Sequence, residues 1–205
     1  MRKVLLVALI LSFVLCSPLT AFTEDKPIKA TAPLTADEIA IYRAVLLQQY
    51  GGSADSSPLN VSIRTYPLDP ESPMSGGLKS SECLKGIQLE NLSVAAHSFH
   101  ELSRDVLTGK QMTLVDSKKH SKIVRSNDPS KTIPKGKSVE NAVEDAFASG
   151  LFSMSEIAFD KERHYAVVSY SFVCGGLCGS GSTIVFEKVN GEWKNAKRNC
   201  GSWIS

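Results

Sequence analysis

The sequence has almost no net charge and few aromatic residues. Its 205 residues include 23 Lys and Arg against 21 Asp and Glu, and only 7% are Phe, Trp or Tyr. The two excess cations are Arg2 and Lys3, so without the first 21 residues the counts become 21 and 21. A chain without an excess of one charge presents no general field to nucleic acid or to an anionic membrane. We therefore expect no nucleic-acid partner.

Long apolar runs are also scarce, and the one that exists lies at the start. Val4–Cys16 is almost entirely apolar, follows Arg2 and Lys3, and is followed by Pro18 and the small residue Ala21. This three-part pattern is typical of a secretory signal peptide, and the run is short for a membrane span. We expect cleavage near Ala21, export to the periplasm or extracellular space, and no transmembrane segment afterwards. An uncleaved anchor and a lipoprotein acylated at Cys16 are the alternatives.

The remaining chain is about one domain long. We predict a signal peptide over 1–21, a flexible lead-in over 22–34, and a single domain over 35–205.

Cysteines are few, and their number becomes even once the leader is removed. The four that remain are Cys83, Cys174, Cys178 and Cys200. An even count in an exported chain favours disulfides. Spacing leaves all three pairings open, and we favour Cys174–Cys178 with Cys83–Cys200. The C-x-x-x-C spacing between strands does not fit a redox C-x-x-C at a helix start, and an oxidising compartment disfavours zinc, so we expect no metal or cofactor.

The N-terminal half predicts helices and one short strand. Thr35 and Glu38 have capping-box spacing at the start of a helix over 36–50. A strand is expected over 59–66 and a loop over 67–81. Apolar residues at helical spacing predict a second helix over 91–107.

The middle of the chain is basic and then helical. The stretch 116–137 holds seven Lys and Arg against two Asp, and we interpret it as a solvated excursion with a short edge strand over 122–125. Ser138 is the expected N-cap of a helix through Ser149. That helix is expected to turn four residues inward: Val139, Val143, Ala146 and Phe147.

The C-terminal residues change to a period of two. Strands are predicted over 155–160, 164–174, 183–189 and 192–199, with a Gly-rich connection over 175–182. Asn190-Gly191 is a favoured two-residue hairpin turn, and counting back from it places Cys200 opposite about residue 181. We predict an α+β fold in which N-terminal helices pack on a C-terminal antiparallel β-meander stabilised by disulfides.

Several short strings in this half have a family resemblance. They are Met154 to Asp160 (MSEIAFD), Cys174 to Gly181 (CGGLCGSG), Glu187 to Lys194 (EKVNGEWK) and the closing GSWIS. Together they resemble a family of small exported bacterial proteins of uncharacterised function, with a CGxLCGxG hairpin and an EKxNGxWK turn. The likeness covers 138–205 well and 36–50 weakly. It implies fold and export, and it brings no activity, cofactor or catalytic residue.

No catalytic set is visible in the sequence. His97, His100 and Glu101 share one flank of the predicted 91–107 helix without a third ligand, and Ser180 lacks the strand-to-helix context of a nucleophile elbow. We therefore expect a monomeric, non-catalytic binding or inhibitor-like module of the cell envelope, with a protein or another envelope ligand as partner. The alternatives are an enzyme assembled from distant residues, with Tyr170, His97 or His164 as candidates, and a purely structural envelope protein.

Overall fold

The computed structural model describes residues 27–30, 32–51, 58–71, 78, 82–198 and 200–205. The predicted signal peptide and residues 22–26 and 31 of the predicted lead-in lie outside these residues. The helices are α1 (Ala36–Tyr50), α2 (Leu92–Ala95), α3 (Ser117–Ser126), α4 (Pro129–Thr132) and α5 (Val139–Ser149), with 3₁₀ turns at Glu82–Leu84, Arg104–Val106 and Ile133–Lys135.

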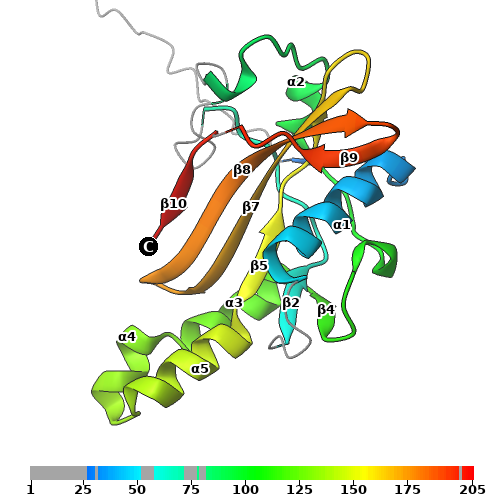
Figure 1. Cartoon of the computed structure of the whole chain (residues 1–205). Helices are drawn as coiled ribbons and strands as arrows, with labels where there is room; N and C mark the ends of the chain where they lie inside the picture. The colour runs from blue at the N-terminus through cyan, green and yellow to red at the C-terminus, as the bar shows by residue number, and fades with distance from the viewer. Residues whose placement is uncertain (1–26, 31, 52–57, 72–77, 79–81, 199) are drawn as a thin grey trace, which may run out of the picture.

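A mixed sheet forms the centre of the molecule (Figure 1). Its strands are β2 (Leu59–Ser62), β4 (Met112–Val115), β5 (Leu151–Met154), β6 (Ala158–Phe159), β7 (Tyr165–Gly175), β8 (Cys178–Val189), β9 (Glu192–Asn195) and β10 (Ser202–Ile204). They run in the order β10-β8-β7-β5-β2-β4, with β6 added beside β7 and β9 beside β8. A separate pair joins β1 (Ile28–Lys29) to β3 (Ser98–Phe99).

The α+β class is confirmed, but the expectation of a purely antiparallel C-terminal meander is wrong. β5, β7, β8 and β9 are antiparallel neighbours, whereas β2 pairs in parallel with both β4 and β5. The N-terminal half therefore contributes strands to the sheet as well as helices. Pairing between distant segments is set by tertiary packing, which local periodicity does not report.

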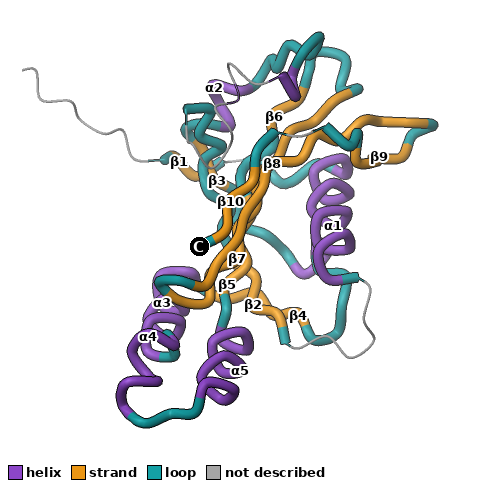
Figure 2. Tube along the Cα trace, turned by 60° about the vertical axis from the view of Figure 1, so that its left-hand side comes forward, coloured by secondary structure: helices purple, strands orange, loops and turns teal. Residues whose placement is uncertain are grey.

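Helix α1 forms as the sequence predicts, because its signals are local. The Thr35 hydroxyl accepts a hydrogen bond from Glu38 N, and Glu38 Oε2 accepts one from Thr35 N at 2.6 Å. The reciprocal bonds satisfy two free amides at the helix start. Four residues of one face are buried in the core: Ile41, Tyr42, Val45 and Leu46. Figure 2 shows α1 on one side of the sheet and α2, β1 and β3 on the other.

Two apolar cores lie on the two faces of the sheet, because alternate residues of a strand point to opposite sides. Ala166 and Val168 of β7 join the core under α1, and Val167 joins the core on the other face. Cys83 and Cys200 lie in this second core. They are paired with a Cα–Cα distance of 5.0 Å, and Cys174 and Cys178 are paired at 5.1 Å. This is the connectivity that we favoured.

The helix predicted over 91–107 is wrong. Only α2 is α-helical there, and β3 and the 3₁₀ turn Arg104–Val106 follow it. Residues after α2 bond to a distant segment: Leu102 N donates to Ile63 O at 2.7 Å, and Thr65 N donates to His100 O at 3.1 Å. Leu102 and Val106 still reach the core, so the apolar spacing was real but the backbone path was not helical.

The basic stretch 116–137 is helical, so the predicted excursion and edge strand over 122–125 are wrong. Asp116 caps α3 by accepting from Lys119 N at 2.8 Å, and Asp128 caps α4, which has Pro129 in its first turn. Lys and Arg are good helix formers, and Val124 supplies the buried contact of α3. The stretch 116–137 has too few apolar residues for their spacing to reveal a helical period in the sequence.

Helix α5 forms as predicted from the Ser138 cap, but it is rotated. Ala142 and Ala146 are buried, whereas three residues predicted to point inward are exposed: Val139 by 56%, Val143 by 41% and Phe147 by 52%. The small side chains of Ala142 and Ala146 let α5 approach its neighbours closely. The larger apolar residues Val139, Val143 and Phe147 therefore lie beside this contact and not within it. Together α3, α4 and α5 form a helical arm at one end of the sheet (Figure 1).

The strand boundaries of the C-terminal half also need correction. Instead of one strand over 155–160, the chain has β5 before Ser155 and β6 after Ile157. Of the Gly-rich stretch predicted as a connection over 175–182, Gly175 ends β7, residues 176–177 form the turn, and the rest belongs to β8, which starts at Cys178. The Asn190-Gly191 turn is as predicted, with φ values of 53° and 84°.

The glycines of β8 make room for Trp203 on the neighbouring strand. Gly181 lies opposite Trp203 in the β8–β10 register, so the expected position of Cys200 opposite residue 181 is off by three residues. A Cβ on Gly181 would overlap Trp203 Nε1, and one on Gly179 would lie 3.2 Å from the same ring. The tryptophan ring therefore rests on bare backbone.

Candidate functional site

A buried glutamate, Glu156, lies in the break between β5 and β6. Its backbone N donates to Tyr66 O at 2.7 Å, which holds the chain out of the regular ladder at this point. Only 4% of the residue is exposed. A buried carboxylate is costly unless it is hydrogen-bonded, so its partners identify the site.

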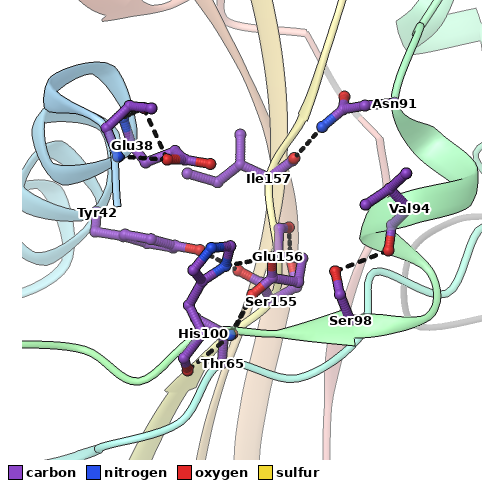
Figure 3. Close-up of polar contacts among 11 residues, drawn as sticks. Glu38, Tyr42, Thr65, Asn91, Val94, Ser98, His100, Ser155, Glu156 and Ile157 are labelled. Carbon is purple, nitrogen blue, oxygen red and sulfur yellow. Dashed lines mark hydrogen bonds and ion pairs between the residues drawn. The ribbon is translucent and has the colours of Figure 1, made fainter. Parts of the chain in front are cut away.

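Each oxygen of Glu156 has a donor. Oε2 lies 2.8 Å from His100 Nδ1, and Oε1 accepts from His100 N at 2.9 Å and from the Thr65 hydroxyl through a very short contact. The carboxylate thus fixes both the ring and the backbone of His100. Figure 3 shows Thr65, His100 and Glu156 converging near the hydroxyl end of Tyr42.

Tyr42 closes the inner side of the cluster. Its hydroxyl donates to Ser155 O at 3.0 Å, and the ring is fully buried under α1. Burial, and secondarily the negative charge of Glu156, raise the pKa of Tyr42 well above its ordinary value. Tyr42 therefore remains a neutral phenol that packs and donates.

The orientation of His100 leaves one ring nitrogen open. An ionised carboxylate only accepts hydrogen bonds, so Nδ1 carries the proton shared with Glu156. Within the part of the chain that the structure describes, Nε2 has no hydrogen-bond partner, and 14% of the side chain is exposed. Nε2 of the neutral ring is thus an acceptor, and a protonated ring would donate from it.

This histidine and Glu156 line a pocket of about 540 Å³. Its apolar walls come from the segment before α1, from α2 and from Ile157, and its polar side includes Glu38, Asn91 and His97. The combination of apolar walls with a few converging polar groups is that of a small-molecule site, and the volume is in the usual range.

The pocket region offers no ready covalent chemistry among the described residues. The Ser98 hydroxyl donates to Val94 O at 2.8 Å, and the Thr35 hydroxyl donates to Glu38 in the capping box. Across the same residues, no group of three or more His, Cys, Asp and Glu could hold a metal ion. The pocket therefore presents the rings of His97 and His100 among its polar groups, and only the His100 ring is held by a buried carboxylate.

The structure brings together only some of the residues singled out from the sequence. His97 lines the same pocket as His100, with its Nδ1 2.8 Å from Ser93 O. Glu101 instead forms exposed ion pairs with Lys29 and Arg64. His164 is exposed at the start of the long hairpin, outside the pocket.

Tyr170 belongs to a second surface feature. It stacks on Phe152 at 5.5 Å, and a partly exposed series of rings continues from Tyr50 to Phe172 at 6.4 Å and to Phe147 at 5.8 Å. This aromatic series joins the end of α1 to the helical arm on one face of the sheet.

Glu156 and Thr65 were missed by sequence reasoning. A usable signal existed for Glu156, because a lone acid directly before the apolar run Ile157-Ala158-Phe159 is unusual in a buried strand. No local signal identified its partners, since His100 and Thr65 are 56 and 91 residues away.

Comparisons with protein-family profiles, curated proteins and solved structures found no match to this chain. Among the described residues, no helix has both the length and the apolar character needed to cross a membrane.

Proposed function

We propose that this protein is an exported binding module that takes a small ligand into the His100 pocket. The observation that carries the proposal is the Glu156–His100 pair, which fixes a histidine with an unbonded ring nitrogen in the lining of a largely apolar pocket. The ligand has an apolar body and one polar group that hydrogen-bonds to His100 Nε2.

Binding is favoured over direct acid–base or nucleophilic chemistry by Glu156, because this carboxylate is fully occupied. Both carboxylate oxygens accept bonds from the protein, so they orient His100 and are not free for a substrate. The neighbouring hydroxyls of Ser98 and Thr35 are engaged in local bonds.

We further propose the periplasm or another oxidising space as the site of action. The N-terminal pattern supports export, and two cysteine pairs at disulfide distance fit such a compartment. An envelope ligand, a monomeric state and membership of the resembled exported family remain part of this proposal.

The experiment is an NMR titration with three probes that share a benzyl body: phenylacetate, 2-phenylethanol and phenylacetamide. Protein labelled at the imidazole carbons reports each histidine separately. We expect at least one probe to shift the His100 ring signal and to leave that of exposed His164 unchanged. His100→Gln should abolish the binding, and His164→Gln is the matched control. His97 lines the same pocket and keeps its label in the His100→Gln protein. A shift of the His97 signal that is as large in His100→Gln as in the wild type, or no shift of His100 with any probe, would contradict the proposal.

The second candidate is general-base catalysis by His100. The observation that favours it is the same bond, since a carboxylate on Nδ1 makes Nε2 a proton acceptor. Hydrolysis of p-nitrophenyl acetate tests this candidate. Turnover that is lost in both His100→Gln and Glu156→Gln, and kept in His164→Gln, would establish a catalytic dyad in place of a simple receptor.

A further inference from the structure

One wall of the pocket is a thin segment that precedes α1. It comprises residues 27–30 and 32–35, called the strap below. Six residues of the strap line the pocket: Ile28, Lys29, Ala30, Ala32, Pro33 and Thr35. The strap lies against residues 97–101, the segment that carries His100.

Among the described residues, the N-terminal half of the strap makes few contacts. Ile28 N donates to His97 O and Ala30 N donates to Phe99 O, both at 2.8 Å. Lys29 Nζ lies 2.7 Å from Glu101 Oε2, with 56% and 40% of the two side chains exposed to solvent. Ile28 is 72% exposed, so its side chain adds little buried contact to the described residues. Short, exposed pairings of this kind open most easily in a folded protein.

The other end of the strap is firmly fixed. Leu34 packs against the core under α1, and Thr35 is locked in the capping box with Glu38. A motion of the free half would therefore pivot near Pro33 and leave α1 in place.

We propose that the strap is a gate for the His100 pocket, held closed by its short pairing with β3 and by the Lys29–Glu101 ion pair. The gate would control ligand entry to the pocket, so its regulatory role rests on the proposed function. The opening motion itself does not depend on whether a ligand binds there. Opening removes one wall of the pocket and exposes the ring of His100. It leaves the Glu156–His100 bond intact, because none of the atoms of that bond belongs to the strap.

The proposal predicts how fast His100 reacts with diethyl pyrocarbonate, which modifies accessible imidazole nitrogens. Lys29→Glu replaces the ion pair with a repulsion against Glu101, and we expect His100 to react roughly three times faster or more, because the open population rises. Exposed His164 serves as the internal reference and should not change. Peptide mass spectrometry measures both rates in the full chain.

A matched control repeats the charge change elsewhere. Lys85 pairs with Glu82 at 3.5 Å on the surface, away from the pocket, so Lys85→Glu should leave the His100 rate unaltered. The opposite variant, Ile28→Cys with Ser98→Cys, joins two residues that are partners in the β1–β3 register and should slow His100 modification below the wild-type rate. The single variant Ile28→Cys should behave as wild type.

The gate is refuted if the His100 rate is the same in Lys29→Glu, in the cross-linked protein and in the wild type. No ligand enters this experiment, so it can fail while the benzyl probes still bind. Conversely, the probes can fail to bind while the strap is shown to open.

Discussion

At the scale of single residues, the Glu156 carboxylate holds the candidate site together. It is buried, it accepts from Thr65 and from two nitrogens of His100, and it lies between the pocket and Tyr42. Its role depends on accepting three hydrogen bonds. An amide in its place would offer a donor where the protein also offers donors.

We therefore expect Glu156→Gln to destabilise the fold by about 1–3 kcal/mol, the usual cost of leaving a buried polar group unsatisfied. Urea unfolding followed by circular dichroism measures the difference. Glu101→Gln is the control, because Glu101 forms only exposed ion pairs, and its effect should be much smaller. Equal effects of the two changes would show that the Glu156 bonds contribute nothing special.

At Gly181 the packing likewise depends on a single atom, because there is no room for a Cβ beside Trp203. A methyl group at this position overlaps the Trp203 ring, so Gly181→Ala should displace Trp203 and loosen β10. We expect a red-shifted tryptophan emission and faster amide exchange in residues 202–204. Gly109→Ala is the control, because a Cβ there would make ordinary contacts, at 3.5 Å from Met112. An unchanged spectrum of Gly181→Ala would mean that the ring finds another place without cost.

At the scale of elements, the start of α1 is tied to the far hairpin. Asp37 accepts from Lys188 Nζ at 2.8 Å and from Trp193 Nε1 at 2.9 Å, and Arg163 lies 3.4 Å away. Partial burial alone would raise the pKa of Asp37. The hydrogen bonds from Lys188 and Trp193, and the nearby cations, outweigh it, so the pKa lies below its ordinary value.

Because the pKa of Asp37 is lower in the folded state, its ionised carboxylate stabilises the fold at every pH above the ordinary pKa of aspartate. This stabilisation is lost as the pH falls through the pKa of the folded state. Asp37→Asn should therefore lower the free energy of unfolding at pH 7 by up to about 1 kcal/mol, since partly exposed ion pairs contribute modestly. The difference from wild type should shrink below about pH 4. Denaturation at several pH values checks this. A difference that stays constant down to pH 2 would locate the effect in packing and not in charge.

At the scale of the whole molecule, the Cys83–Cys200 bond has the widest reach. It joins two cysteines 117 residues apart within the core opposite α1. Closing so long a loop limits the unfolded chain, and we expect Cys83→Ser with Cys200→Ser to cost about 3–5 kcal/mol. Thermal unfolding measures this loss. Cys174→Ser with Cys178→Ser is the comparison, because its short loop restrains far fewer unfolded conformations and should cost less.

How much of this molecule the sequence predicts depends on the range of each signal. The α1 capping box, the Ser138 cap and the Asn190-Gly191 turn are local, and all three form as predicted. The parallel pairing of β2 and the meeting of Glu156 with His100 join segments far apart in the chain, and no nearby residue encodes them. Helix α5 lies between these cases, because its cap is local whereas its buried face is chosen by its neighbours.

The pair Cys83–Cys200 makes one covalent ring of most of the folded chain. A protease that cuts a single peptide bond anywhere between these two cysteines, for instance in the turn between α4 and α5, would release no fragment. The nicked protein would run as one species until a reductant separates its pieces. A damaged molecule in an oxidising space would in this way stay in one piece.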